Sequence, residues 1–237
     1  MWADVVMRPD ICFAVSALAQ FNENPGIAHW EAVKRVFWYL KGTRDVGLTY
    51  GLTQTGLVSF TNADGNLQEH RWAISGYAYL IDGTAVSWMS KKQELVTLLM
   101  TESKYMAATH AAKEGIWLCH LISEVFRPLV SPTTLYCNNQ SAIALTNDGS
   151  FHARMKHIDI HYHFICYVVE DGTIKLLYCP TDTMAANILT KPLPAPCLLS
   201  IAQSLGLHVL AVWRGSVGRI KHANGLSTDM QYRLYRV

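Results

Sequence analysis

The segment YCNNQSAIAL, residues 136–145, places two asparagines, Asn138 and Asn139, between strand-like sequence and the start of a predicted helix. In α/β folds, ligands and metal ions gather at the carboxyl ends of strands. A carboxylate at this place would indicate a metal site, because Mg²⁺ prefers hard oxygen ligands that also carry charge. An amide supplies no charge. The segment therefore has the position of an active site without the usual chemistry of one.

Histidines form a second candidate cluster, made of His152, His157, His161 and His163. His157 and His161 lie four residues apart on a predicted helix, and this spacing could share one zinc ion. No Cys or acidic residue lies at a matching second spacing, so packed or solvated histidines are the favoured interpretation. No G-x-S-x-G motif indicates a serine nucleophile, and the glycine-containing segments are typical of turns.

The elements that must position these residues follow from the hydrophobic pattern. Residues 8–41 predict a helical hairpin that breaks at Pro25 and Gly26. Strands follow in a row, and the last two are joined by a turn at Asp82-Gly83. The further expected elements are helix 94–126, strand 133–139, helix 140–147, helix 157–172, strand 173–181 and helix 183–191. This order predicts an α/β fold with a mixed sheet covered by helices.

Composition limits the class of protein. The chain has 237 residues, of which 50% are hydrophobic and 16% charged, so a sizeable core can form. The net charge of +2 neither proves nor excludes nucleic-acid binding. The cysteines form no CxxC pair, which favours buried free thiols in a reducing compartment, cytoplasm or nucleus. We expect no membrane span and no signal peptide, and the first residues read like the middle of a longer polypeptide.

The sequence resembles the ribonuclease H region of Ty1/copia-type retrotransposon Pol polyproteins. The matching segments are RPDICFAVSALAQF, HWEAVKRVFWYLKGT, SGYAYLIDGTAVSWMSKKQ, AAKEGIWL, CNNQSAIAL, HARMKHIDIHYHFI and ANILTKPLP, within residues 7–194. The resemblance implies an α/β, ribonuclease H-like fold with a mixed five-stranded sheet flanked by helices and preceded by a helical hairpin. It implies two parts: residues 1–50 as the end of a reverse transcriptase and 51–194 as the ribonuclease H-like domain. Beyond them the hydrophobic pattern weakens, and we expect residues 195–237 to form a helix, at 197–210, and a poorly ordered tail.

Members of this family cut the RNA strand of an RNA–DNA hybrid with two Mg²⁺ ions held by four carboxylates. Two such ions activate the attacking water and stabilise the leaving oxygen. The resemblance places the four acids at Asn62, Lys104, Asn138 and Asn187. All four are replaced in this chain, three by amides and one by an ammonium group. Each replacement is reachable by one G-to-A change in a codon, which supports the hypothesis of a decayed copy.

Charge decides what these replacements mean. Four carboxylates would give the site about −4, whereas three amides and one lysine give about +1, and one unit-charge pair ~4 Å apart is worth about 4 kcal/mol at an effective dielectric constant of ~20. We therefore predict no bound metal at these positions. A residual acid is Asp64, two residues beyond Asn62 and on the same face of a regular strand. Glu102 is predicted to face away from the site.

Basic residues on loops and at element ends are candidates for contacts to the phosphates of a nucleic acid. They are Arg71, Lys91, Lys92, Lys104, Arg154, Lys156 and Lys191. Such contacts give salt-sensitive affinity that does not depend on sequence. The expected partners are therefore an RNA–DNA hybrid or duplex, bound weakly, and the remainder of a Pol polyprotein. Ordinary solvated charges are the equally favoured alternative.

Three hypotheses about function remain open at this point. The first is a catalytically inactive ribonuclease H-like remnant that retains nucleic-acid affinity. The second is an active, Mg²⁺-dependent hybrid ribonuclease with relocated ligands such as Asp64. The third is a domesticated structural or interaction module. A cleavage assay on a labelled hybrid separates the second hypothesis from the other two.

Overall fold

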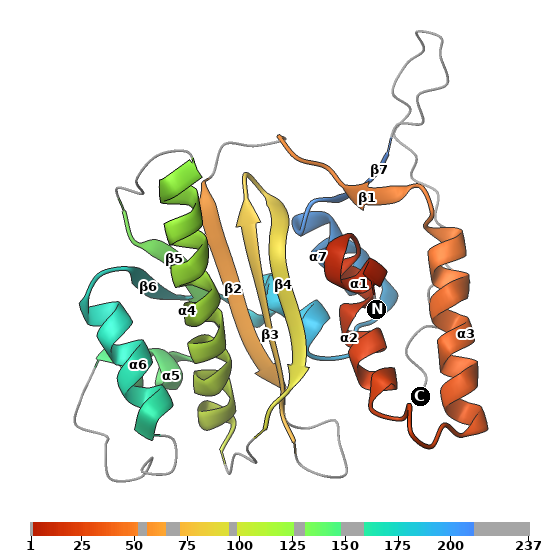
Figure 1. Ribbon diagram of the computed structural model, residues 1–237, viewed down its shortest axis with the longest axis horizontal. Helices are drawn as coiled ribbons and strands as arrows, with labels where there is room; N and C mark the ends of the chain where they lie inside the picture. The colour runs from red at the N-terminus through yellow and green to blue at the C-terminus, as the bar shows by residue number, and fades with distance from the viewer. Residues whose placement is uncertain are drawn as a thin grey trace, which may run out of the picture.

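A computed structural model describes residues 2–51, 56–64, 72–94, 99–125, 131–147 and 159–210 (Figure 1). Its centre is a five-stranded sheet in the order β4-β3-β2-β5-β6. The strands are β2 (Leu57–Asp64), β3 (Ile74–Ile81), β4 (Thr84–Lys92), β5 (Thr133–Cys137) and β6 (Ile174–Tyr178). Strands β2, β3 and β4 are antiparallel, whereas β2, β5 and β6 are parallel. The predicted mixed five-stranded sheet is confirmed.

Helices cover both faces of this sheet (Figure 1). On one face lie α4 (Met100–Val125), α5 (Gln140–Asn147) and α6 (Asp159–Glu170). On the other lie α2 (Pro9–Ala19), the 3-10 helix η4 (Ala185–Leu189) and α7 (Ala195–Ser204). None of the helices in the described part of the chain has both the length and the hydrophobicity of a transmembrane helix.

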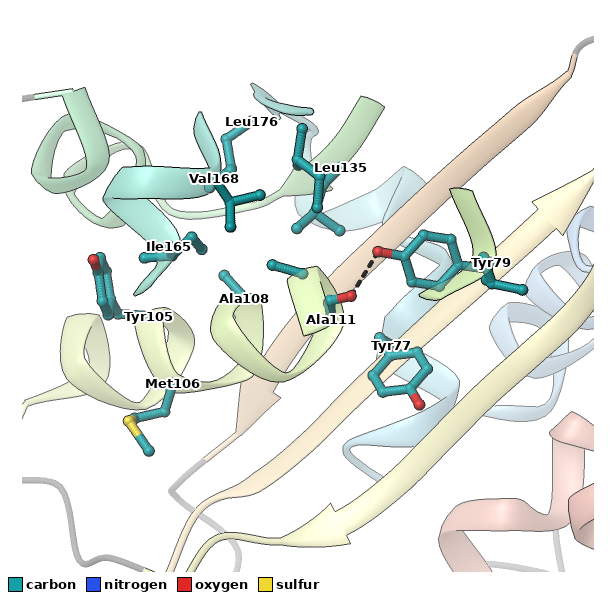
Figure 2. Close-up of a cluster of buried hydrophobic side chains, with 13 residues drawn as sticks. Tyr77, Tyr79, Tyr105, Met106, Ala108, Ala111, Leu135, Ile165, Val168 and Leu176 are labelled. Atoms are coloured by element: carbon teal, nitrogen blue, oxygen red, sulfur yellow. Dashed lines mark hydrogen bonds between the residues drawn. The ribbon is translucent and has the colours of Figure 1, made fainter. Parts of the chain in front are cut away.

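Strand β3 divides its side chains between two hydrophobic cores. Successive side chains of a strand point to opposite faces, so Tyr77 and Tyr79 face α4 while Ala78 and Leu80 face α2 and α7. The buried Tyr79 hydroxyl donates to the carbonyl oxygen of Ala111 on α4 at 2.7 Å (Figure 2). The turn that ends β3 carries Asp82 and Gly83 at φ 51° and 81°, as a two-residue hairpin of type I′ requires.

The close approach of α4 to β3 depends on a glycine. A Cβ atom added at Gly115 would lie 2.3 Å from the Tyr79 hydroxyl oxygen. Glycine is therefore required at this position for α4 to reach the sheet.

The N-terminal helices join the sheet that follows them mainly through α2, which packs against β4. They are α1 (Trp2–Val6), α2 and α3 (Ile27–Gly42), of which α2 and α3 are the predicted hairpin. The Trp88 Nε1 atom on β4 donates to the carbonyl oxygen of Asp4 at 2.6 Å. Strand β1 (Val46–Leu48) pairs with β7 (Leu207–Val209), so the segment that follows the N-terminal helices shares a small sheet with the end of the described chain. This pairing was not predicted.

A buried ion pair fixes the hairpin. The Arg8 guanidinium donates to both carboxylate oxygens of Asp10, at 2.9 and 2.7 Å. It also donates to the carbonyl oxygen and the hydroxyl of Thr43 at the end of α3. The Tyr39 hydroxyl donates to Asp10 at 2.7 Å. Burial lowers the pKa of Arg8, but the hydrogen bonds and charge of Asp10 outweigh this, and the pKa is raised overall.

Two predicted helices near the C-terminus are wrong in detail. Residues 183–191 do not form the expected α-helix. This part of the chain instead contains two short 3-10 helices, η3 (Thr181–Thr183) and η4. The Asn187 Nδ2 atom donates to the carbonyl oxygen of Thr181, and the Thr190 hydroxyl donates to that of Asn187. Such local bonds compete with the bonds of an α-helix. The helix predicted at 197–210 ends at Ser204, and the chain then forms β7. The tail, 211–237, lies outside the described residues.

Candidate functional site

The four positions expected to carry acids meet where β2 and β5 end. These strands are parallel, with Thr61 opposite Cys137, so Asn62 and Asn138 are the next residues on neighbouring strands. Helix α4 contributes Lys104 and η4 contributes Asn187. The structure joins the four side chains as two hydrogen-bonded pairs. Their elements are distant in the sequence, and the parallel sheet edge brings them together.

Asn62 and Asn187 form the first pair. The Asn62 Nδ2 atom donates to Asn187 Oδ1 at 2.7 Å and to the Thr190 hydroxyl at 3.3 Å. Asn187 donates in turn to the carbonyl oxygen of Thr181 at 2.7 Å. Both asparagines are 3% exposed. This buried chain of amides ties β2 to η4.

Lys104 and Asn138 form the second pair. The Lys104 Nζ atom donates to Asn138 Oδ1 at 2.7 Å, and both side chains are half-buried. Burial lowers the pKa of Lys104 because the ammonium loses solvation. Cys137 and Asp64 act in the opposite direction, whereas the positive charge of Lys191 lowers the pKa further. Asp64 ends β2 two residues after Asn62, and the backbone N–H of Lys191 donates to the carbonyl oxygen of Asn187, so both residues belong to the same edge of the sheet as Lys104.

The donor set does not fit a pair of divalent metal ions. Asn138 Oδ1 accepts from the Lys104 ammonium, and Asn187 Oδ1 accepts from Asn62. This leaves Asn62 Oδ1, a buried oxygen with no hydrogen-bond partner among the described residues. One neutral oxygen neither offsets the charge of Mg²⁺ nor fills its coordination shell. In the described ranges, no three His, Cys, Asp or Glu residues are grouped so that they could hold a metal ion.

The two acidic residues considered near the site, Asp64 and Glu102, lie in different surroundings. Asp64 ends β2 and is half-buried. Glu102 is buried, and its carboxylate accepts a hydrogen bond from the backbone N–H of Leu99 at 3.3 Å. That carboxylate lies at the N-terminal end of its own helix, where a negative charge is favourable.

The predicted nucleic-acid contacts are placed only in part. Lys91 donates to Glu94 at 2.9 Å, and the Lys92 ammonium lies 5.3 Å from the centre of the Trp72 ring. Three more candidates lie outside the described residues: Arg71, Arg154 and Lys156. His152 and His157 also lie outside them, as do the side chains of His161 and His163, so the favoured interpretation of packed or solvated histidines stays a prediction.

Sequence reasoning missed two residues that hold the site together, Thr181 and Thr190. Thr190 is fully buried and hydrogen-bonded to Asn62, and Thr181 accepts from Asn187 through its backbone. Threonine at a helix end is too common to indicate this role. The only usable signal was the short distance in sequence from Asn187.

The sheet order and the four converging positions define a ribonuclease H-like domain. No family model matches the sequence. The chain is 40% identical over 210 residues to the Retrovirus-related Pol polyprotein from transposon TNT 1-94 of Nicotiana tabacum, an alignment that covers 88% of this chain and 16% of that protein. It is 34% identical to the Pol polyprotein from transposon RE2 of Arabidopsis thaliana, over 90% of this chain and 15% of that protein.

The chain belongs to the family of copia-type retrotransposon Pol polyproteins and spans about one sixth of the length of these relatives. Among solved structures, it is similar to LC11-RNase H1 in complex with RNA/DNA hybrid. That match has a TM-score of 0.43 and 12% identity, and it covers 56% of this chain and 93% of the other.

Proposed function

We propose that this chain is a copia-type ribonuclease H-like domain that has lost RNA-strand cleavage and retains weak affinity for an RNA–DNA hybrid or duplex. The observation that carries the proposal is the hydrogen bond from Lys104 Nζ to Asn138 Oδ1. It places an ammonium group among the positions where the family resemblance expects carboxylates. As part of a Pol polyprotein, the domain would act inside the cell, in the cytoplasm or nucleus.

The chemistry of the intact family needs a negative site. Two Mg²⁺ ions would supply the activated water and stabilise the leaving oxygen. Here the oxygen atoms of Asn138 and Asn187 are already used as acceptors within the protein. Bringing divalent cations near Lys104 would add repulsion of about 4 kcal/mol for each pair of unit charges ~4 Å apart. This supports the absence of a productive two-metal centre.

Nucleic-acid affinity does not require the lost acids. Lysine ammonium groups contact phosphates as point charges, and Lys91, Lys92, Lys104 and Lys191 occur near the ends of sheet strands or at the site. Replacing acids by neutral groups removes repulsion of the phosphate backbone. We therefore expect weak binding that falls as the salt concentration rises.

A cleavage assay tests the loss of activity. The parent chain and a variant with all four acids restored (Asn62→Asp, Lys104→Glu, Asn138→Asp, Asn187→Asp) are incubated with a labelled RNA–DNA hybrid and Mg²⁺. We expect cleavage by the restored variant and none by the parent. Circular dichroism and urea unfolding of both proteins show that each is folded.

The competing function, cleavage with a relocated ligand, has one observation in its favour, which is that Asp64 ends β2 two residues after Asn62. Cleavage by the parent chain would overturn the proposed loss of activity. If that cleavage disappears in Asp64→Asn, the relocated-ligand function is correct. Inactivity of both the parent and a folded restored variant would contradict the assignment of the four positions.

A further inference from the structure

The Lys104 side chain is an unusual cation for its surroundings. Among the described residues, its ammonium has one hydrogen bond, to the neutral oxygen of Asn138, and no carboxylate within 4 Å. An ammonium group carries three N–H donors, so two donors remain for other partners. Lysine carries its charge at the end of a flexible stem, so a half-buried lysine can keep its ammonium group accessible to a ligand. This one is presented at the strand ends.

The charges around Lys104 favour an anion. Lys191 directly follows η4, where its backbone N–H donates to the carbonyl oxygen of Asn187, and it adds a second positive charge, while Asp64 at the end of β2 is the carboxylate on this edge of the sheet. The two asparagines on the neighbouring strand ends, Asn62 and Asn138, are neutral. Two cations against one carboxylate leave the site positive. A phosphate that approaches it gains Coulomb energy, whereas a divalent cation loses it.

We infer that Lys104 is a metal-independent phosphate-binding residue, which contacts the phosphodiester backbone of a nucleic acid directly at the place where the family would hold metal ions. A phosphate oxygen accepts a hydrogen bond from Lys104 Nζ, while Asn138 keeps the side chain aimed at the strand ends. This inference rests on the proposed function and adds to it the residue and the chemistry of binding.

Direct contact by an ammonium has two consequences that binding through metal would not have. Affinity persists in EDTA, and added Mg²⁺ weakens binding no less than NaCl at the same ionic strength. Each phosphate contact also releases condensed counterions and contributes about −0.9 to the slope of log affinity against log salt. Loss of one contact should make that slope shallower by about 0.9.

The test is a fluorescence anisotropy titration of the full chain with a labelled RNA–DNA hybrid, and separately with duplex DNA, in EDTA. Lys104→Met is compared with Lys175→Met, which removes an exposed cation near the start of β6, away from the carboxyl ends of the strands. Between roughly 50 and 200 mM salt, the parent should lose about 3.5-fold more affinity than Lys104→Met, as one lost contact predicts. Lys175→Met should follow the parent.

Lys104→Arg keeps the positive charge and should retain the salt slope of the parent, which distinguishes a charge effect from a local structural effect. Equal slopes for the parent, Lys104→Met and Lys175→Met would overturn the inference, as would binding that requires Mg²⁺ or no binding in EDTA at low salt. None of these outcomes depends on cleavage. Cleavage of the hybrid by the parent would overturn the proposed function, while the salt slopes would still decide the role of Lys104.

Discussion

The side-chain amide of Asn62 donates to the side-chain oxygen of Asn187 at 2.7 Å, across 125 residues of sequence. An amide can donate and accept at once, so two asparagines form a complementary pair where two carboxylates would repel each other. The two side chains therefore depend on each other. Together they let β2 and η4 pack without a metal ion between them.

Restoring one acid of this pair should destabilise the fold. In Asn62→Asp, a carboxylate replaces the donor and lies against Asn187 Oδ1 at a position only 3% exposed. Leaving a buried charge without compensation costs about 3 kcal/mol. We expect a decrease of that size in the free energy of unfolding, measured by urea denaturation near neutral pH. The decrease should shrink in acid, because a protonated carboxyl can donate to Asn187.

Asn138→Asp is the matched control, since it makes the same chemical change on the neighbouring strand. Its new carboxylate would accept from the Lys104 ammonium that already binds Asn138. The hydrogen bond would then join an ammonium to a carboxylate, which is stronger than the present bond to a neutral amide oxygen. The free energy of unfolding should therefore be unchanged or higher. If Asn62→Asp and Asn138→Asp lower the free energy of unfolding equally, the argument that only Asn138 has a cationic partner is wrong.

Lys104 should make stability depend on pH in the alkaline range. Its folded pKa is lowered from 10.5, chiefly by burial, whereas the unfolded chain regains the ordinary value. Between these two pKa values the unfolded state binds more protons, so the free energy of unfolding rises with pH. Lys104→Met lacks this contribution. The stability of the parent relative to the variant should therefore increase from neutral pH towards 10.5.

Urea denaturation of the parent and Lys104→Met at about pH 7.5 and about pH 10 measures this change, and other titrating groups contribute equally to both proteins. A constant difference between the two proteins would mean that the ammonium is not desolvated in the folded state.

The sequence predicted the fold well where a local pattern determined the structure. The helix expected at residues 140–147 has those bounds, and the hairpin turns at Asp82 and Gly83. The pairing of β1 with β7 could not be predicted, because two three-residue strands carry no signal for a partner so distant in sequence. Asn187 was expected on an α-helix, but its bonds to nearby backbone groups favour a 3-10 helix.

The family resemblance named four candidate positions, but it did not predict how their side chains pair. The motif located Asn62, Lys104, Asn138 and Asn187 without showing which side chains would bond. The structure couples Asn62 with Asn187 and Lys104 with Asn138. Which side chains bond to each other depends on how neighbouring helices and strands are shifted relative to one another. Hydrophobic periodicity carries no information about that shift. The roles of Arg71, Arg154 and Lys156 remain predictions.

The buried ion pair of Arg8 and Asp10 should contribute strongly to stability. Arg8→Met would leave the Asp10 carboxylate, only 1% exposed, without its bidentate partner. Removing one member of a buried pair costs about 3–5 kcal/mol. Urea denaturation should show a loss of this size. Lys34→Met, which breaks the more exposed Lys34–Glu31 pair on α3, should cost less than about 1 kcal/mol.

Similar losses for Arg8→Met and Lys34→Met would contradict this argument. Arg8→Lys gives a further comparison, because lysine keeps the charge but cannot form the two parallel hydrogen bonds to Asp10. Its stability should fall between those of the parent and Arg8→Met.

The N-terminal segment should be required for folding of the sheet domain, although the sequence suggested a boundary near residue 50. Cys12 on α2 lies in the same core as Ala85 and Leu198, and β1 supplies the partner strand of β7. A chain that lacks residues 1–50 would expose this core. We expect it to lose cooperative urea unfolding, and adding residues 1–50 as a separate chain should restore it.

A shorter deletion separates this effect from general damage at the terminus. Removing residues 1–6 takes away α1, whose Trp2 and Val5 side chains are exposed, and the hydrogen bond from Trp88 to Asp4. This variant should still unfold cooperatively. If the chain without residues 1–50 unfolds at the same urea concentration as the parent, the segment is a separate unit. Because α2 and α7 fill one core together, we expect the sheet domain to depend on both ends of the described chain.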